Sequence, residues 1–210
     1  MKPSSQTELA DKIAAQAEFA VDNVRQTDYL HKAEIDPALG TYDCDCSEFV
    51  SFVLQTVSLK HYNEVPIEPG ESRPRAFKYY DFLHGLQMEA KPGWETIRFL
   101  RHAGRGDVVA WRTQTIEKGQ DTGHVLILAD TPVPDDSGIF TVRVYDSADR
   151  PHFNDTRGHA EGQFPRGVGS GFLKFEVDDQ GKPEAFLFSP SSKNFDKKVI
   201  AIGRLSSFSS

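Results

Sequence analysis

Asp45-Cys46-Ser47-Glu48-Phe49-Val50 follows a turn-rich segment and begins a run of apolar residues that extends to Leu59. The apolar spacing within 47–59 predicts a largely buried helix, and Asp45 is well placed to cap its start. Cys46 would then lie in or near the first turn, where free backbone N–H groups and the positive end of the helix dipole favour a thiolate. The stretch therefore predicts a reactive cysteine on a helix that packs against a core.

The remaining periodicity places helices in the first half of the chain and strands in the second. Besides 47–59, the predicted helices are 5–23, 75–86 and 94–102. The predicted strands are 108–111, 124–129, 140–146, 171–177, 185–188 and 199–205. The first three strands are separated by turn residues and predict an antiparallel meander. Helices followed by a sheet are typical of an α+β architecture.

The 210 residues suit one elaborated domain. We expect a single domain over 1–210, with a helical insertion at about 60–104 and a C-terminal strand extension at about 165–205. The segment 147–170 is rich in Gly, Arg, His and Asp and has almost no periodicity, and long irregular loops of this kind are often functional. The glycines of 167–171 fit a hairpin turn better than a phosphate-binding loop.

The composition excludes several classes of function. Asp plus Glu number 31 against 24 Lys plus Arg, a net charge of −7, so the chain has no general attraction for nucleic acids. The two cysteines, Cys44 and Cys46, lie too close in sequence to link distant segments, which excludes a disulfide scaffold. No segment approaches the roughly 20 apolar residues of a membrane-spanning helix, so we expect a soluble protein without a membrane span.

The N-terminal segment lacks the apolar core of a secretory signal. Three locations stay open: the cytoplasm, a destination reached by another export route, or the periplasm or extracellular space after removal of a signal. A toxin delivered into the periplasm of a neighbouring cell is one form of the second option. The oligomeric state also stays open.

A cysteine nucleophile needs a base, and the base needs a third group to orient it. Among seven histidines, His124 begins a strongly predicted central strand directly after Gly123. Its backbone would be rigid, as the placement of a catalytic base requires. Asp146, at the end of the next predicted strand, is the natural orienting acid, because a meander brings neighbouring strands together. His152, in the irregular loop, is the second candidate for that role.

Four short sequence elements, taken together with their order along the chain, carry a resemblance to a known family. They are Asp45-Cys46-Ser47-Glu48-Phe49-Val50, Gly106-Asp107-Val108-Val109-Ala110-Trp111, Gly123-His124-Val125-Leu126-Ile127 and Val144-Tyr145-Asp146-Ser147-Ala148. Over roughly 42–148 the chain thereby resembles the NlpC-type papain-like cell-wall cysteine peptidases. The resemblance implies a papain-like α+β fold, in which N-terminal helices bearing the nucleophile pack on a central antiparallel β-sheet.

The resemblance also implies an activity: cysteine-dependent amide hydrolysis through an acyl-enzyme, acting on a peptide or muropeptide-like substrate of the bacterial cell wall. It implies Cys46 as nucleophile, His124 as base and Asp146 as third member of a catalytic triad, with no cofactor and no metal. The residues expected to contact substrate are Tyr42, Asp45, Ser47, Glu48, Gly123 and His152. Glu48 departs from the glycine usual in the family and brings a bulky charge close to the nucleophile.

Other interpretations of these residues stay open. The same scaffold could carry an acyltransferase, a transamidase or a thioesterase, or a catalytically silent binding module in which Cys46 is a small buried apolar side chain. Cys44 could tune Cys46 or fill space. A metal site at 43–46 would lack the second ligand pair of a structural zinc site. Asp146 could simply end a strand, and His152 and His159 could lie in solvent.

Overall fold

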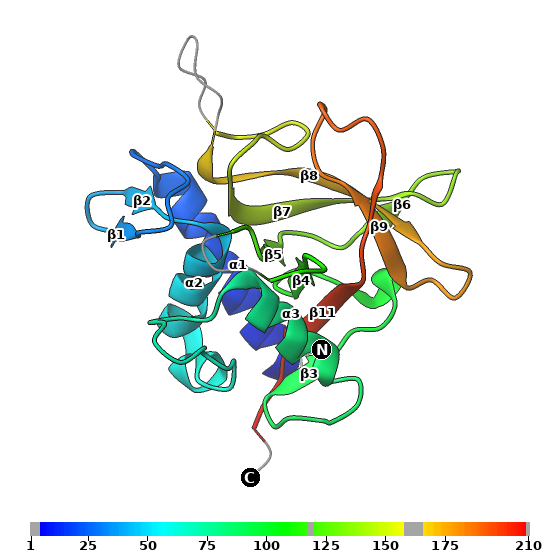
Figure 1. Cartoon of the computed structure of the whole chain (residues 1–210), viewed down its shortest axis with the longest axis horizontal. Helices are drawn as coiled ribbons and strands as arrows, with labels where there is room; N and C mark the ends of the chain where they lie inside the picture. The colour runs from blue at the N-terminus through cyan, green and yellow to red at the C-terminus, as the bar shows by residue number, and fades with distance from the viewer. Residues whose placement is uncertain (1–4, 117–119, 158–165, 209–210) are drawn as a thin grey trace.

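The computed structural model describes residues 5–116, 120–157 and 166–208, and in these ranges it contains three α-helices and a curled antiparallel sheet (Figure 1). The helices are α1 (Ser5–Asn23), α2 (Cys46–Tyr62) and α3 (Ala76–Gly85). The large sheet consists of β3 (Trp94–Thr96), β4 (Val108–Arg112), β5 (Gly123–Leu128), β6 (Val133–Pro134), β7 (Phe140–Ala148), β8 (Gly167–Val177), β9 (Pro183–Leu187), β10 (Asp196–Lys197) and β11 (Ile200–Leu205). A separate hairpin ahead of α2 pairs β1 (Glu34–Asp36) with β2 (Thr41–Asp43). The predicted α+β class is confirmed.

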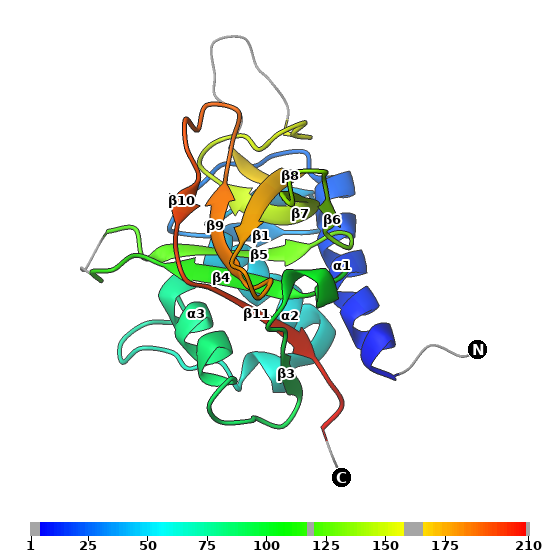
Figure 2. The ribbon, with the colours of Figure 1, turned by 90° about the vertical axis from the view of Figure 1, so that its right-hand side faces the viewer.

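The strands of the large sheet follow the order β10-β9-β8-β7-β5-β4-β11-β3, and β6 pairs with β7. All neighbouring pairs are antiparallel. The predicted meander is present, since β4, β5 and β7 are successive neighbours. The sheet curls until β9 contacts β11, and Figure 2 shows β9 and β10 passing across β4 and β5.

The helices pack on one face of this sheet. α1 contacts α2 and β7, α2 contacts β5 and β7, and α3 contacts β4, β5 and β11. Figure 1 shows α2 and α3 below the strands β7 and β8, and α1 also contacts β8. None of the helices in the described ranges is long and apolar enough to cross a membrane.

The central strands β4 and β5 are buried on both faces. Side chains on one face join the core beneath the helices: Val108, Ala110, Val125 and Ile127. Side chains on the other face join a second core enclosed by the curled sheet: Val109, Trp111, Leu126 and Leu128. Successive residues of a strand point to opposite faces, so a strand covered on both sides has a continuous apolar sequence. This burial explains the unbroken apolar runs at 108–111 and 125–129.

The prediction of a short helix at 94–102 is wrong. Residues 94–96 form β3, which pairs with β11 at the edge of the sheet, and Leu100–His102 forms a single 3-10 turn. The indole of Trp94 donates a hydrogen bond to the carbonyl of His61 at 3.3 Å. A short amphipathic run does not distinguish helix from strand by itself, and here the pairing with β11 decides the outcome.

Of the strands in the predicted C-terminal extension, β8, β9 and β10 continue the sheet beyond β7, whereas β11 lies within it. β11 lies between β4 and β3, with Ile202 opposite Val109. The predicted hairpin turn at 167–171 is wrong, because these residues begin β8 and pair with β7. Their glycines have a steric reason: a Cβ at Gly169 would overlap the side chain of Arg157, and one at Gly171 would lie 2.6 Å from the Cβ of His152.

Gly106 lies in the turn before β4, and α1 packs closely against it. It has a φ of +85°, and a Cβ there would overlap the carbonyl of Ala10 in α1. Gly138 has a similar φ of +82° but open space around it. We expect Gly138→Ala to lower the free energy of unfolding by about 1 kcal/mol through backbone strain alone. Gly106→Ala should cost roughly 3 kcal/mol or more, because steric overlap adds to that strain.

Urea unfolding followed by circular dichroism measures both variants. Equal losses in the two proteins would show that α1 does not pack tightly on this turn.

Candidate active site

Cys46 is the first residue of α2 and is buried, with 3% of its surface exposed. Asp45 is the N-cap, and its side chain accepts a hydrogen bond of 2.9 Å from the backbone N–H of Glu48, as predicted. The N–H of a residue at the first helical position has no acceptor inside the helix. The cysteine therefore lies at the positive end of the helix dipole, where a thiolate is favoured.

His124 lies on β5 between Cys46 and Asp146. Its Nε2 is 2.6 Å from Oδ2 of Asp146, and its ring also interacts with the Cys46 side chain. Since Nε2 is engaged by Asp146, Nδ1 is the nitrogen that remains for Cys46. Burial alone would lower the pKa of His124, but the charge of a Cys46 thiolate and the bonds to Asp146 and Cys46 raise it to about 9. A histidine with this pKa is mostly protonated at neutral pH.

Asp146 is completely buried on β7 and is surrounded by donors. Nη2 of Arg157 lies 2.5 Å from its Oδ1, and Nε2 of His152 lies 2.9 Å from its Oδ2. Burial would raise the pKa of Asp146, but the charges of His152 and Arg157 and the bonds from both histidines hold it well below the usual range. Asp146 is thus a carboxylate that accepts the Nε2–H of His124 and fixes the direction of the ring.

His152 is buried in this network and does not line the pocket beside His124. Its Nδ1 is 3.1 Å from the carbonyl oxygen of Phe188, and its Nε2 faces Asp146. Carbonyl and carboxylate oxygens only accept hydrogen bonds, so each of these bonds is donated by the ring nitrogen that makes it. The structure therefore places His152 in contact with the Asp146 carboxylate, buried and away from the residues that line the pocket. His159, the other loop histidine, lies outside the described residues.

A tyrosine hydroxyl does face the nucleophile, but it belongs to Tyr29 and not to Tyr42. The Tyr29 hydroxyl lies 4.0 Å from the sulfur of Cys46. Burial, together with the negative charges of Cys46 and Asp45, raises the pKa of Tyr29, so its hydroxyl stays protonated. Tyr42 is fully buried edge-on to Phe52, and its hydroxyl has no hydrogen-bond partner among the described residues.

The other residues expected to contact substrate surround the nucleophile. Asp45, Ser47 and Glu48 hold the first turn of α2, and each of the three contacts Arg73. Gly123 has a φ of +121°, and a Cβ there would overlap the backbone of Trp111 on the neighbouring strand. Only glycine fits this close approach, which leads directly into His124.

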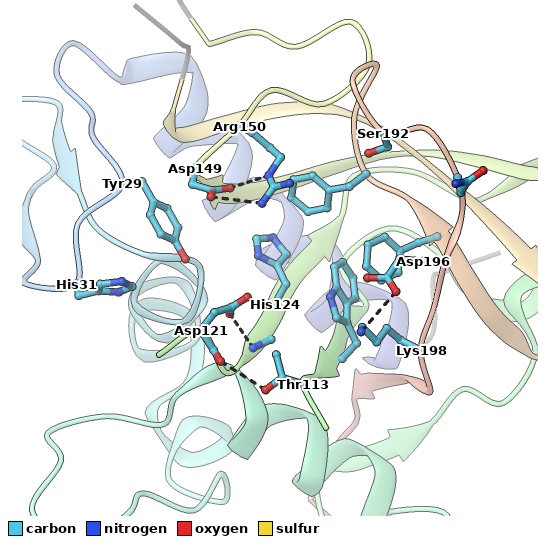
Figure 3. A pocket seen from close by; sticks show the side chains of 15 residues that line it. Tyr29, His31, Thr113, Asp121, His124, Asp149, Arg150, Ser192, Asp196 and Lys198 are labelled. Carbon is cyan, nitrogen blue, oxygen red and sulfur yellow. Dashed lines mark hydrogen bonds and ion pairs between the residues drawn. The ribbon is translucent and has the colours of Figure 1, made fainter. Parts of the chain in front are cut away.

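A pocket of about 390 Å³ opens beside His124 (Figure 3). Its aromatic wall consists of Trp111, Phe186 and Phe188. Its rim carries two ion pairs, Arg150–Asp149 and Lys198–Asp196. Figure 3 shows His124 near the centre of the opening, between Tyr29 and the aromatic rings. Cys46 is not among the residues that line this pocket.

The structure brings Cys46, His124 and Asp146 together in the predicted order. It also adds three residues that sequence reasoning did not find: Tyr29, Arg73 and Arg157. Each reaches the site from an irregular segment where no periodicity marks it. The one available signal was indirect, since the glycines at 169 and 171 leave room for Arg157 and His152. In the described residues, no group of three or more His, Cys, Asp or Glu side chains could hold a metal ion.

Comparisons with known proteins name no activity. No family model matches the chain, and no solved structure matches it. The chain is 29% identical over 181 residues to Uncharacterized protein R653 of Acanthamoeba polyphaga mimivirus, an alignment that covers 77% of each protein. This relative is viral, whereas the sequence motifs resemble a bacterial cell-wall family. The papain-like resemblance therefore stays a prediction.

The two cysteines provide an internal comparison of reactivity. Cys44 is fully buried, and burial followed by the charges of Asp45 and Glu48 raises the pKa of its thiol. Cys46 lies at the helix start beside His124. We expect iodoacetamide at pH 7 to modify Cys46 at least ~10-fold faster than Cys44, because the thiolate is the reacting form.

Peptide mass spectrometry of the native protein measures both rates. In His124→Gln the rate at Cys46 should fall toward that of an ordinary thiol, whereas equal rates in the wild-type and variant proteins would contradict the Cys46–His124 pairing.

Proposed function

We propose that the protein is a cysteine-dependent amide hydrolase that works through Cys46, His124 and Asp146 on a papain-like scaffold. The observation that carries the proposal is the chain of contacts from the Cys46 sulfur through the His124 ring to the buried Asp146 carboxylate, 2.6 Å from that ring. A purely structural cysteine would need neither a helix start nor a histidine with a raised pKa. This combination supports a nucleophile with its base and orienting acid.

In the proposed reaction the Cys46 thiolate attacks the carbonyl carbon of an amide, and a C–S bond forms. His124, protonated on Nδ1, gives its proton to the departing nitrogen as the C–N bond breaks, which leaves a thioester on Cys46. Water then attacks the thioester, His124 takes a proton from that water, and the C–S bond breaks. The carboxylic acid product leaves, and the thiolate–imidazolium pair is restored.

Two donors are available for the oxyanion of the tetrahedral intermediates. One is the backbone N–H of Cys46 at the start of α2, which has no intrahelical acceptor. The other is the Tyr29 hydroxyl, 4.0 Å from the sulfur. Tyr29 keeps its proton because burial and the nearby negative charges raise its pKa. Removing one such donor typically slows the reaction by about 10²–10³.

The pocket supports a peptide substrate better than a long acyl chain. Its aromatic wall is small, and charged side chains on two opposite rims, Arg150 with Asp149 and Lys198 with Asp196, could hydrogen-bond the polar groups of a peptide. A lipid acyl chain would instead need an apolar channel. We therefore propose a short peptide as substrate, with cell-wall stem peptides as the first class to test because of the motif resemblance.

Hydrolysis of purified muropeptides, followed by chromatography and mass spectrometry, tests the activity. We expect Cys46→Ala to lower the rate by at least ~10³-fold, because the nucleophile is lost. Cys44→Ala is the matched control and should keep activity within a few-fold, since Cys44 is buried in the core and faces away from the reaction.

Adding hydroxylamine separates hydrolysis from transfer. A hydrolase releases the free acid even when this acceptor competes with water, whereas a transamidase or acyltransferase yields transfer product alone. If wild-type protein binds muropeptides without cleaving them, the binding-module alternative holds.

The pH dependence tests the role of His124 as acid. Its pKa of about 9 predicts that kcat/KM falls as the pH rises through about 9, where the pair loses the proton needed by the leaving nitrogen. Asp146→Asn removes a negative charge that helps to raise this pKa, so the fall should move to lower pH, with a rate loss of roughly 10² or more.

The exposed Asp136, in the β6–β7 connection, provides a control in which Asp136→Asn leaves the profile in place. A fall at the same pH in Asp146→Asn, with the fold retained by circular dichroism, would remove Asp146 from the mechanism.

A further inference from the structure

Arg73 lies in the loop between α2 and α3, and its side chain reaches the first turn of α2. Nη2 of Arg73 is 2.6 Å from Oδ2 of Asp45, and its Nη1 is 2.5 Å from Oγ of Ser47. Its Nε forms an ion pair with Glu48. One guanidinium thus contacts the residue before the proposed nucleophile and the two residues after it. The Arg73 side chain is only 12% exposed, so this arrangement is partly shielded from water.

The same contacts offset the negative charge that two carboxylates place close to Cys46. Asp45 and Glu48 bring two carboxylates within two residues of Cys46, and negative charges close to a thiol disfavour the thiolate. Arg73 supplies one compensating positive charge between them. Burial would lower the pKa of Arg73, but the charges of Asp45 and Glu48 outweigh this effect and raise it. Without Arg73, the two carboxylates would oppose the helix dipole that favours the Cys46 thiolate.

We propose that Arg73 is a positioning residue for Cys46, which holds the first turn of α2 and compensates the Asp45 and Glu48 carboxylates so that the thiolate persists. The inference rests on the proposed nucleophilic role of Cys46. It also connects two features that the motif resemblance leaves unexplained. Glu48, which replaces the glycine usual in that family, has its partner in Arg73, and Arg73 comes from the segment 60–104 that was predicted as an insertion.

The chemistry of arginine fits this role better than that of lysine. A guanidinium presents several N–H donors in a planar fork and can hold separate acceptors at once. Three acceptors on three different side chains surround Arg73, whereas an ammonium would satisfy them only by moving between them. Arg73→Lys therefore keeps the charge but loosens the turn.

Other ionisable groups face Cys46 and contribute to its environment. Tyr29 and His124 interact with Cys46 directly, whereas His31 contacts Asp45, Asp121 acts on Tyr29, and Asp146 bonds to His124. His31 contacts Oδ2 of Asp45 at 3.2 Å, but its side chain is 79% exposed, so solvent screens its charge. Arg73 is the buried cation that contacts both first-turn carboxylates.

The pH profile of Cys46 alkylation by iodoacetamide, followed by peptide mass spectrometry, tests the proposal. We expect Arg73→Met to move the midpoint of the profile to higher pH and to slow alkylation at pH 7 by about three- to tenfold, because an uncompensated pair of carboxylates disfavours the thiolate. The double variant Arg73→Met with Glu48→Gln removes one carboxylate and should recover most of that loss. A merely structural role for Arg73 would give no such recovery.

Arg75 is the matched control. It lies two residues further along and pairs with Glu68 at 2.8 Å, away from α2. Arg75→Met should leave the profile in place. The proposal is overturned if Arg73→Met matches the wild type, if Arg75→Met shifts the profile equally, or if the double variant recovers nothing. If Arg73→Met does not fold, Glu48→Gln decides alone: faster alkylation at pH 7 supports the proposal, and an unchanged rate overturns it.

Muropeptide hydrolysis measured on the same proteins separates this proposal from the proposed function. Wild-type hydrolysis that needs Cys46, with an unshifted Arg73→Met profile, would keep the function and reject the role of Arg73. A shifted profile in a protein that cleaves no muropeptide would support the role of Arg73 in thiolate retention and count against cell-wall peptides as substrate.

Discussion

The buried carboxylate of Asp146 is the constraint on which the site depends. A charge with no contact to water is tolerated only when it is paired and hydrogen-bonded, and Asp146 meets this demand with two histidine rings and the guanidinium of Arg157. These partners impose further requirements. Strand β8 needs glycine opposite His152 and Arg157, and Phe188 must present its carbonyl to His152. The direction of the His124 ring thus depends on β7, β8, the loop after β7 and the end of β9.

The second constraint is the double burial of β4 and β5. One face packs beneath the helices and the other faces the interior of the curled sheet. His124 lies at the start of β5, so a strand fixed from both sides holds its backbone, while α2 holds Cys46 through the helix-facing core. The backbones of Cys46 and His124 therefore belong to two rigid elements that pack on each other, while residues from loops, Arg73 and Arg157 among them, hold the groups around their side chains.

Local patterns in the sequence were sufficient to predict those rigid elements. The helix from Cys46, its Asp45 cap and the strands at β4, β5 and β7 follow from apolar periodicity and capping chemistry, which act within a few residues. The turn expected at 167–171, the helix expected at 94–102 and the role given to Tyr42 failed for a different reason. Each depended on a partner distant in sequence: Arg157 and His152 for the glycines, β11 for residues 94–96, and the segment before β1 for Tyr29. Periodicity contains no information about such partners.

The place of β11 between β4 and β3 has a consequence for how the chain acquires its structure. The ribosome makes Val109 about halfway through the chain and its partner Ile202 near the end. The edge of β4 that pairs with β11 therefore stays unpaired until nearly the whole chain has been made. An apolar strand with an open edge is prone to pair with another chain. Contacts between residues so distant in sequence also form slowly. Until β11 has been made, the β4 edge is thus the part of the central sheet most open to pairing with another chain.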